Sequence, residues 1–236
     1  MNNFFGIFAM PLSYILSFLY NFIGQYGISL IVLTIIVKLA LYPLYKKQII
    51  STTGMSGLSS KVRELQVKYA NDRKMMNEKM QELYKEEGVN PASGCLPMFV
   101  QMLVIMGLFI LLRYPTQYLG SEYMFFAVHE RFFWVNDLSQ PDPWILPLLA
   151  GVATFLSMYM SQQNNTVASS GAMMGVMKYG MPVMIIWLAK TYPAGLALYW
   201  FISNLMQIFF NIRFNKIREE MNGEKTGKKK KRKKRA

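Results

Sequence analysis

The chain has 236 residues, of which 53% are hydrophobic, and its formal net charge at pH 7 is +13. Hydrophobicity of this size does not by itself separate a soluble domain from a membrane protein. The distribution of acidic residues does, because all 13 Asp and Glu fall within residues 64–87, 122–142 and 219–224. The single cysteine, Cys95, excludes an internal disulfide, and without a CxxC pair no metal or redox cofactor is expected.

The first segment, residues 1–24, is apolar and long enough to resemble a signal peptide or an additional span. It lacks a positively charged start and a small-residue cleavage signal, so removal as a signal peptide is not expected. Pro11, Ser13, Ser17, Asn21 and Gln25 recur at about helical spacing. This pattern predicts an amphipathic helix that lies at the outer interface of the membrane, with a sixth span as the alternative.

Five stretches without acidic residues follow, at 28–45, 95–112, 144–160, 174–190 and 194–210. Each is close to the roughly 20 residues that a helix needs to cross a hydrocarbon core of about 30 Å. The sequence therefore predicts an all-α polytopic membrane protein, with five transmembrane helices in a membrane domain that covers residues 25–215.

The placement of Lys and Arg predicts the orientation of these spans. Residues 46–90 contain nine Lys or Arg and residues 211–236 contain twelve, whereas residues 114–143 contain Arg131 alone, beside four acids. Cytoplasmic loops of membrane proteins carry an excess of Lys and Arg. We therefore expect the 46–90 segment and the C-terminus in the cytoplasm and the aromatic-rich 114–143 loop outside.

Within the first basic segment, apolar residues recur at steps of three and four from Leu58 to Tyr69 and again from Met76 to Leu83. The pair Asn71-Asp72 separates the two runs. The pattern predicts a cytoplasmic helical hairpin within residues 50–88. Its methionines are compatible with a partner-binding surface, while a solvated linker is the plainer interpretation.

The C-terminal segment, residues 216–236, is a low-complexity basic run that we expect to be disordered. Its charge suits anionic lipid or the phosphate backbone of RNA, and the sequence leaves these two partners open. The basic residues at its end are Lys228, Lys229, Lys230, Lys231, Arg232, Lys233, Lys234 and Arg235.

Lys38 lies in an otherwise apolar span, seven residues before Tyr45 at the cytoplasmic boundary. A charge at such a depth is costly in lipid, so Lys38 is expected to face a polar cavity, with snorkelling to the headgroups as the alternative. Thr34 lies one turn earlier on the same face. The last span has a polar stripe of its own, formed by Trp200, Ser203, Asn204, Gln207 and Asn211. The two polar faces predict a hydrated groove, and polar contacts that merely join helices are the alternative.

No catalytic motif of the GxSxG, HExxH or Walker type is present, and no Asp or Glu falls within a predicted span. We therefore expect the protein not to be an enzyme. His129 lies in the outer loop without a partner pattern and is expected to be a surface residue.

Three motifs stand out along the chain. They are residues 34–44 (TIIVKLALYPL), residues 90–97 (NPASGCLP) followed by Gln101, and residues 193–205 (PAGLALYWFISNL). Together they resemble the YidC family of membrane protein insertases, in which similar motifs form the first conserved span, open the second and form the last. The motifs occur in the family's order across residues 25–215.

The resemblance implies a groove around Lys38 that is open to the cytoplasm and to lipid but closed outside. There the polar segment of a newly made membrane protein would be received, and its apolar helix released into the bilayer, without nucleotide hydrolysis. Thr34 and Tyr199 occupy positions associated with client contact, and Trp200 is adjacent. The remaining groove residues that we expect are Gln101, Ser157, Ser203, Asn204 and Gln207.

The resemblance also suggests a monomer in the bacterial cell membrane, with the ribosome, the Sec translocon and anionic lipid as partners. In two places the chain departs from the family. Lysine stands at position 38, where arginine is usual, and Ser157 stands where a glutamine often precedes a turn. In its short form and basic tail the chain resembles Gram-positive-type members, some of which hold ribosomes. A small-solute transporter and a passive ribosome-tethering anchor are the competing hypotheses.

Overall fold

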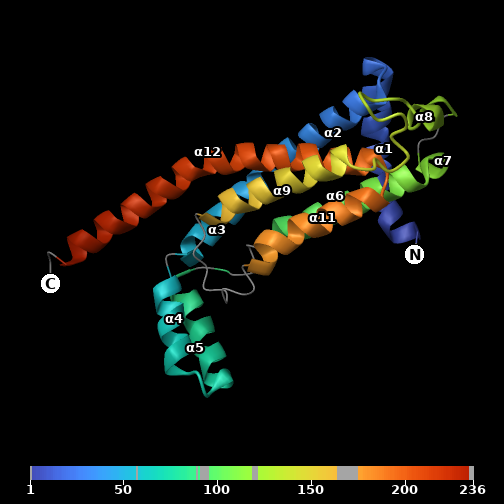
Figure 1. The fold of residues 1–236 in the computed structure, drawn as a ribbon. Coiled ribbons are helices and arrows are strands. Elements are labelled where there is room, and N and C mark those ends of the chain that lie inside the picture. The colour runs from blue at the N-terminus through green and yellow to red at the C-terminus, as the bar shows by residue number, and fades with distance from the viewer. Residues whose placement is uncertain are drawn as a thin grey trace.

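The computed structural model describes residues 2–56, 58–88, 90, 96–118, 122–163 and 175–233. Over these ranges the regular elements are helices, accompanied by an isolated β-bridge between Phe132 and Val135. Figure 1 shows most helices in one elongated bundle, from whose left-hand end a helical hairpin and the end of the last helix project. The predicted all-α fold class is confirmed.

Helix α1 (Asn2–Ile23) leads through Gly24, whose φ is +74°, into helix α2 (Tyr26–Ala40). Figure 1 shows α1 crossing the bundle at the end opposite the hairpin. It packs closely on helix α6, since an added Cβ at Gly107 would lie 3.1 Å from the carbonyl carbon of Phe8. Residues 6–23 are also long and apolar enough to cross a membrane. The position of α1 along the membrane interface therefore stays a prediction.

The first predicted span, residues 28–45, is bent in the structure. Helices α2 and α3 (Tyr42–Ser56) meet at an angle of 48°. Pro43 lies in the first turn of α3 and has no N–H to donate to the carbonyl of residue 39, which accounts for the break. Lys38 and Tyr45 consequently stand on two different helical segments.

The helical hairpin consists of α4 (Ser59–Lys68) and α5 (Arg73–Glu86). Asp72 caps α5 by accepting a 3.0 Å hydrogen bond from the Met75 N–H. Leu58, Val62 and Leu83 form a small core between the two helices. The predicted hairpin and its turn agree with these positions.

The remaining apolar helices are α6 (Leu96–Arg113), α9 (Ile145–Gln163), α11 (Met181–Thr191) and α12 (Ala194–Lys233). A π-helical turn, η2 (Val176–Gly180), precedes α11, and the short helices α7 (Pro115–Tyr118) and α8 (Glu122–Ala127) follow α6. Within the part of the chain that the structure describes, two helices, or three if the bent pair is one span, are long and apolar enough to cross a membrane. The apolar parts of α6 and α9 are shorter, so the five-span path stays a prediction.

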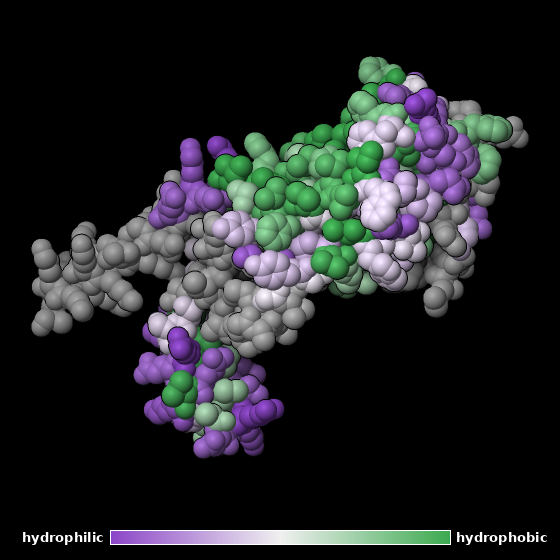
Figure 2. Space-filling model, in the orientation of Figure 1, coloured by the Kyte–Doolittle hydropathy of each residue, from purple (hydrophilic) through white to green (hydrophobic). Residues whose placement is uncertain are grey.

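Helix α12 is the centre of the bundle and packs against α9, α2, α3 and α6. Its buried residues Leu196 and Tyr199 join Leu30, Leu33 and Leu111 in the main hydrophobic core. On the face drawn in Figure 2, apolar side chains gather over the middle of the bundle, and polar side chains lie at its right-hand end and on the hairpin. This distribution is what a lipid-facing surface requires.

Helix α12 continues to Lys233, whereas the sequence predicts disorder over residues 216–236. Lys, Arg and Glu are good helix formers, and a helix that is already nucleated in the bundle extends readily through them. Residues 234–236 lie outside the described part of the chain.

A substitution at Gly151 tests the packing of α9 against α11. An added Cβ at Gly151 would lie 2.3 Å from Cγ1 of Ile186, so Gly151→Ala should lower the free energy of unfolding by about 1–3 kcal/mol. Gly195→Ala is the matched control, because its nearest neighbours would lie 3.4 Å or more away. Denaturant unfolding in detergent micelles, followed by tryptophan fluorescence, measures both. Equal unfolding midpoints for the two variants would contradict this contact.

Candidate functional site

Lys38 is buried near the end of α2, with only 4% of its surface exposed. Its Nζ donates to the hydroxyl oxygen of Tyr45 and to Oε1 of Gln101, in both cases over 3.1 Å. The Nζ also lies 4.9 Å from the centre of the Tyr45 ring, within the range of a cation–π contact. The cation is therefore held by side chains from α3 and α6.

The contacts extend from Lys38 into a network that joins four helices. The Tyr45 hydroxyl donates to Oε1 of Gln101 over 2.9 Å, and Nε2 of Gln101 donates to the hydroxyl oxygen of Tyr199 on α12. Ser203 lies one turn beyond Tyr199 on α12 and is 5% exposed. We call Lys38, Tyr45, Gln101 and Tyr199 the Lys38 network. It ties α2, α3, α6 and α12 together near the end of the bundle that leads to the hairpin.

The partners that the structure shows for the Lys38 cation, among the described residues, are neutral oxygens. A buried ammonium group without an acidic partner is costly, and hydrogen bonds to neutral groups offset only part of that cost. Such a site favours an incoming carboxylate, because charge-assisted hydrogen bonds are about twice as strong as neutral ones. In this conformation Thr34, Tyr199 and Ser203 are also 5% exposed or less, whereas Gln101 is partly exposed, so protein covers most of the network but not all of it.

Thr34 and Trp200 lie beside the network without an observed hydrogen bond to it. The Thr34 hydroxyl donates to the Leu30 carbonyl within α2 over 2.7 Å. The Trp200 side chain is 6% exposed, and its ring centre lies 6.5 Å from that of Tyr192. Their expected contact with clients stays a prediction.

The polar stripe of α12 is divided between two neighbours. Nδ2 of Asn204 donates to Oγ1 of Thr154 on α9 over 3.0 Å, and Nδ2 of Asn211 donates to the Ser157 carbonyl over 3.2 Å. Asn204 and Ser157 thus belong to a seam between α9 and α12. This is the arrangement expected of polar groups that join helices, and Gln207 lies half-buried on the turn between the two asparagines.

Sequence reasoning used Tyr45 only as a boundary marker and did not consider Thr154. The spacing of seven residues between Lys38 and Tyr45 was the available signal, because residues seven apart share a helix face. Thr154 stands three residues before Ser157 on the same face of α9. Of the predicted tail residues, those from Lys228 to Lys233 lie on the α12 backbone, while Lys234 and Arg235 lie outside the described residues.

The outer loop closes the opposite end of the bundle through backbone hydrogen bonds. The N–H of Ala194 donates to the Gln140 carbonyl over 2.8 Å, and the N–H of Gly195 donates to the Leu138 carbonyl over 2.9 Å. These are among the first N–H groups of α12, which have no partner within the helix. The loop therefore supplies hydrogen-bond partners to the first turn of α12.

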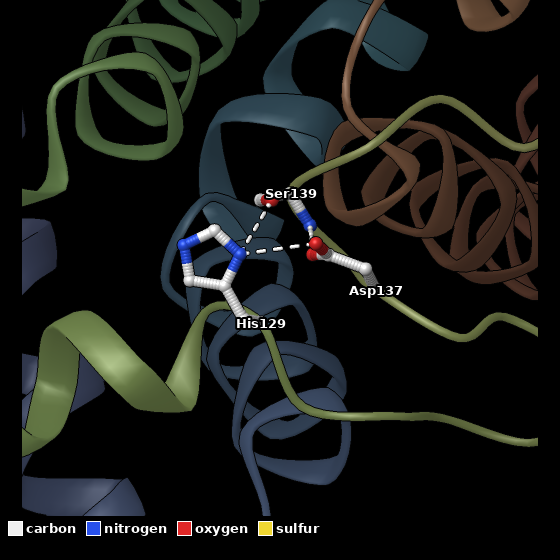
Figure 3. Close-up of polar contacts among 3 residues, drawn as sticks. All are labelled: His129, Asp137 and Ser139. Atoms are coloured by element: carbon white, nitrogen blue, oxygen red, sulfur yellow. Dashed lines mark hydrogen bonds and ion pairs between the residues drawn. The ribbon is translucent and has the colours of Figure 1, made fainter.

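His129, expected to be a plain surface residue, has two partners that hold this loop (Figure 3). Its Nδ1 lies 3.0 Å from Oδ2 of Asp137 and 3.0 Å from Oγ of Ser139. A Ser-His-Asp catalytic triad needs the serine at one ring nitrogen and the aspartate at the other. Both contacts are made by the same nitrogen here, so the cluster fastens the loop and does not form a relay.

The network predicts that Tyr45→Phe lowers the stability of the fold, because the substitution removes one acceptor of Lys38 and one donor to Gln101. We expect the free energy of unfolding in micelles to fall by about 1–3 kcal/mol, the usual effect of leaving buried polar groups unpaired. Tyr42→Phe is the matched control, since the Tyr42 ring stacks on Phe214 with centres 5.4 Å apart. The interpretation fails if the two variants are equally stable.

The outer loop predicts a pH dependence through Asp137. Partial burial opposes ionisation of this carboxyl, but hydrogen bonds from His129 and Ser139 outweigh burial and hold its pKa below the usual value. Its stabilisation is therefore present above the ordinary Asp pKa of about 3.9 and is lost as the pH falls through the lower, folded-state pKa. The difference in unfolding midpoint between wild type and Asp137→Asn should stay constant above about pH 5 and should shrink as the pH falls below about 4. A constant difference would show that the carboxylate charge is not involved.

Residues 18–222 match the family described as 60Kd inner membrane protein. A protein named membrane protein insertase YidC, from Geobacter sp. (strain M21), is 36% identical over 216 residues, which cover 91% of this chain and 38% of the relative. A protein of the same name from Shewanella frigidimarina (strain NCIMB 400) is 38% identical over 202 residues, covering 85% of this chain and 35% of the relative. The chain thus spans little more than a third of the length of these relatives.

A solved structure described as an active YidC insertase, with its first transmembrane domain resolved, has the same fold. The TM-score is 0.62 at 27% sequence identity, and the match covers 88% of this chain and 46% of that one. With the family match extending over most of its length, the chain belongs to the 60Kd inner membrane protein family, and its resemblance to the YidC proteins is confirmed.

Proposed function

We propose that this protein inserts client proteins into the bacterial cell membrane. A short polar client segment binds beside Lys38, and the apolar client helix passes into lipid without nucleotide hydrolysis. The relatives described above are named insertases, and the family is one of inner membrane proteins. One observation carries the proposal. Lys38 is buried at the junction of helices and its described partners are neutral groups of Tyr45 and Gln101.

In this proposal the Lys38 network is the resting state of the client site. Tyr45 and Gln101 reduce the cost of burying the cation while no client is bound. An acidic client side chain displaces them, because an ion pair is stronger where water is scarce. The two neutral groups remain within reach of each other and of Tyr199, so the exchange does not strand their hydrogen bonds.

The lipid-facing flank of the bundle offers a path for the client's apolar helix. On α6, Phe99 and Met102 are 61% and 58% exposed, and on α11, Val183 and Met184 are 65% and 44% exposed. A client helix that leaves the network meets these apolar side chains and then lipid. Burial of apolar surface, worth about 25 cal/mol per Å², supplies the free energy.

The basic end of the bundle is proposed to face the cytoplasm, in accordance with the distribution of Lys and Arg. Helix α12 reaches about 24 Å beyond Ile217, the end of its apolar part, to Lys233 (Figure 1). It would carry the basic tail toward a ribosome or along anionic lipid. Newly made membrane proteins are the proposed clients, with the Sec translocon as a further partner of a monomeric protein.

Insertion into proteoliposomes that contain only this protein tests the proposal. Wild type should bring a short single-span client with an acidic outer segment into a protease-protected state. Lys38→Glu should reduce the protected fraction about tenfold, the scale of losing one charge-assisted contact of about 1.5 kcal/mol. Replacing the client's acids with lysine should restore insertion by Lys38→Glu.

Two further variants sharpen the test. Gln101→Glu places a carboxylate of the protein itself within reach of Lys38. This carboxylate should compete with the client for Lys38. Lys190→Gln is the matched control, because Lys190 lies on α11 with its Nζ 3.6 Å from the centre of the Trp144 ring. No protected client above empty liposomes would overturn the insertase function, whereas insertion unaffected by Lys38→Glu would overturn only the role of Lys38.

A further inference from the structure

The outer loop contains a tight aromatic turn, residues 132–135. The N–H of Phe132 donates to the Val135 carbonyl over 2.8 Å, and the N–H of Val135 donates to the Phe132 carbonyl over 2.9 Å. Phe133 and Trp134 form the tip and are 73% and 44% exposed. Two large aromatic side chains thus stand at the point of the turn with much of their surface uncovered by protein.

The backbone at the tip is unusual. Phe133 has a φ of +52°, in the left-handed region, and it is the only such residue other than glycine among those described. A bulky residue rarely takes this conformation, which Gly, Asn and Asp adopt more easily. The Phe133 ring packs edge-on against Phe132, with ring centres 4.6 Å apart, yet 73% of Phe133 stays exposed.

The base of the turn is fixed to two apolar helices. Phe132 lies against the first turn of α2, where an added Cβ at Gly27 would come within 2.3 Å of its ring. Nε1 of Trp134 donates to Oδ2 of Asp142 over 2.9 Å. Asp142 in turn accepts the N–H of Trp144 over 2.9 Å at the start of α9. The turn is therefore held at a defined position between the first turns of α2 and α9.

Exposed apolar side chains lie near the turn at the starts of α2 and α9. Ile28, next to Gly27, is 39% exposed, and Ile145, next to Trp144, is 48% exposed. Glu130 connects the same region to the junction of α1 and α2 by accepting the N–H of Tyr26 over 2.8 Å. The tip thus stands at the level at which the apolar helices begin, where tryptophan is favoured at the interface of a bilayer.

We propose that this aromatic turn is a membrane anchor, with Phe133 inserted into the outer leaflet and Trp134 at the level of the lipid headgroups. The Phe133 ring gains free energy by leaving water, and the indole keeps its polar edge on Asp142 while its apolar face meets lipid. This explains an exposed phenylalanine in the left-handed region. The anchor would hold the loop that closes the outer end of α12 at a constant depth. It does not depend on the insertase proposal.

The depth of a nitroxide label at position 133 tests the anchor. The full chain, with Cys95→Ser and Phe133→Cys, is labelled and reconstituted into vesicles of phosphatidylethanolamine and phosphatidylglycerol. Electron paramagnetic resonance then compares accessibility to O₂, which partitions into lipid, with accessibility to a water-soluble nickel chelate. Val152→Cys on α9 and Val67→Cys on the hairpin, whose parent side chains are 56% and 74% exposed, serve as lipid and water references.

We expect the ratio of O₂ to nickel accessibility at position 133 to match that at position 152 and to exceed that at position 67 several-fold. A ratio equal to that at position 67 would place the turn in water and overturn the anchor. Low accessibility to both reagents would show a protein partner or a second copy on the turn, which also overturns it.

A second measurement leaves the turn intact in case the label disturbs it. With Trp144, Trp187 and Trp200 changed to Phe, the fluorescence of Trp134 should be quenched by lipids brominated near the headgroup and poorly by aqueous acrylamide. Asparagine tolerates the left-handed conformation. Adding Phe133→Asn should therefore weaken the lipid quenching without disturbing the backbone of the turn. Quenching by acrylamide alone would contradict insertion.

Discussion

A buried cation surrounded by neutral groups is the constraint on which the hairpin end of the bundle depends. Lys38 belongs to α2, its two hydrogen-bond partners belong to α3 and α6, and Tyr199 of α12 holds one of them. None of these helices can move far without leaving a polar group unpaired in an apolar interior. An unpaired buried polar group costs more free energy than the hydrogen bond contributes when it is formed. The 48° bend between α2 and α3 belongs to this arrangement, because it lies between the cation and Tyr45.

The two ends of the bundle are closed by different means, and this difference supports a one-sided client path. At the outer end, loop carbonyls pair with backbone N–H groups of Ala194 and Gly195, and the His129 cluster fastens that loop. At the hairpin end, the closure consists of side-chain hydrogen bonds around a charge. A client side chain does not readily replace a hydrogen bond between two backbone groups. A client carboxylate can replace the neutral partners of an ammonium group. In the proposed function, exchange with a client is therefore favoured at the Lys38 end.

Sequence patterns predicted the helices, the hairpin and the burial of Lys38 beside polar groups, but they did not predict which helices the other polar groups join. Helical spacing places Tyr199, Ser203 and Asn204 on overlapping faces of α12, and spacing alone does not tell which neighbour each face meets. In the structure Tyr199 contacts Gln101 of α6, while Asn204 contacts Thr154 of α9. Tyr45 was missed because a tyrosine at a span boundary is equally typical of an interfacial anchor. The helical continuation to Lys233 was missed because composition describes an isolated segment and not one that extends an existing helix.

The number of hydrogen-bond donors gives a physical reason for lysine at position 38. An ammonium group has three N–H donors, and the Tyr45 hydroxyl and Oε1 of Gln101 satisfy two of them. A guanidinium group has five donors in a rigid plane and would leave more of them unpaired among the same partners. The small network therefore suits lysine while no client is bound. In the proposed function, a client carboxylate supplies an acceptor that either cation can use. The choice of lysine would then act mainly on the stability of the protein without a client.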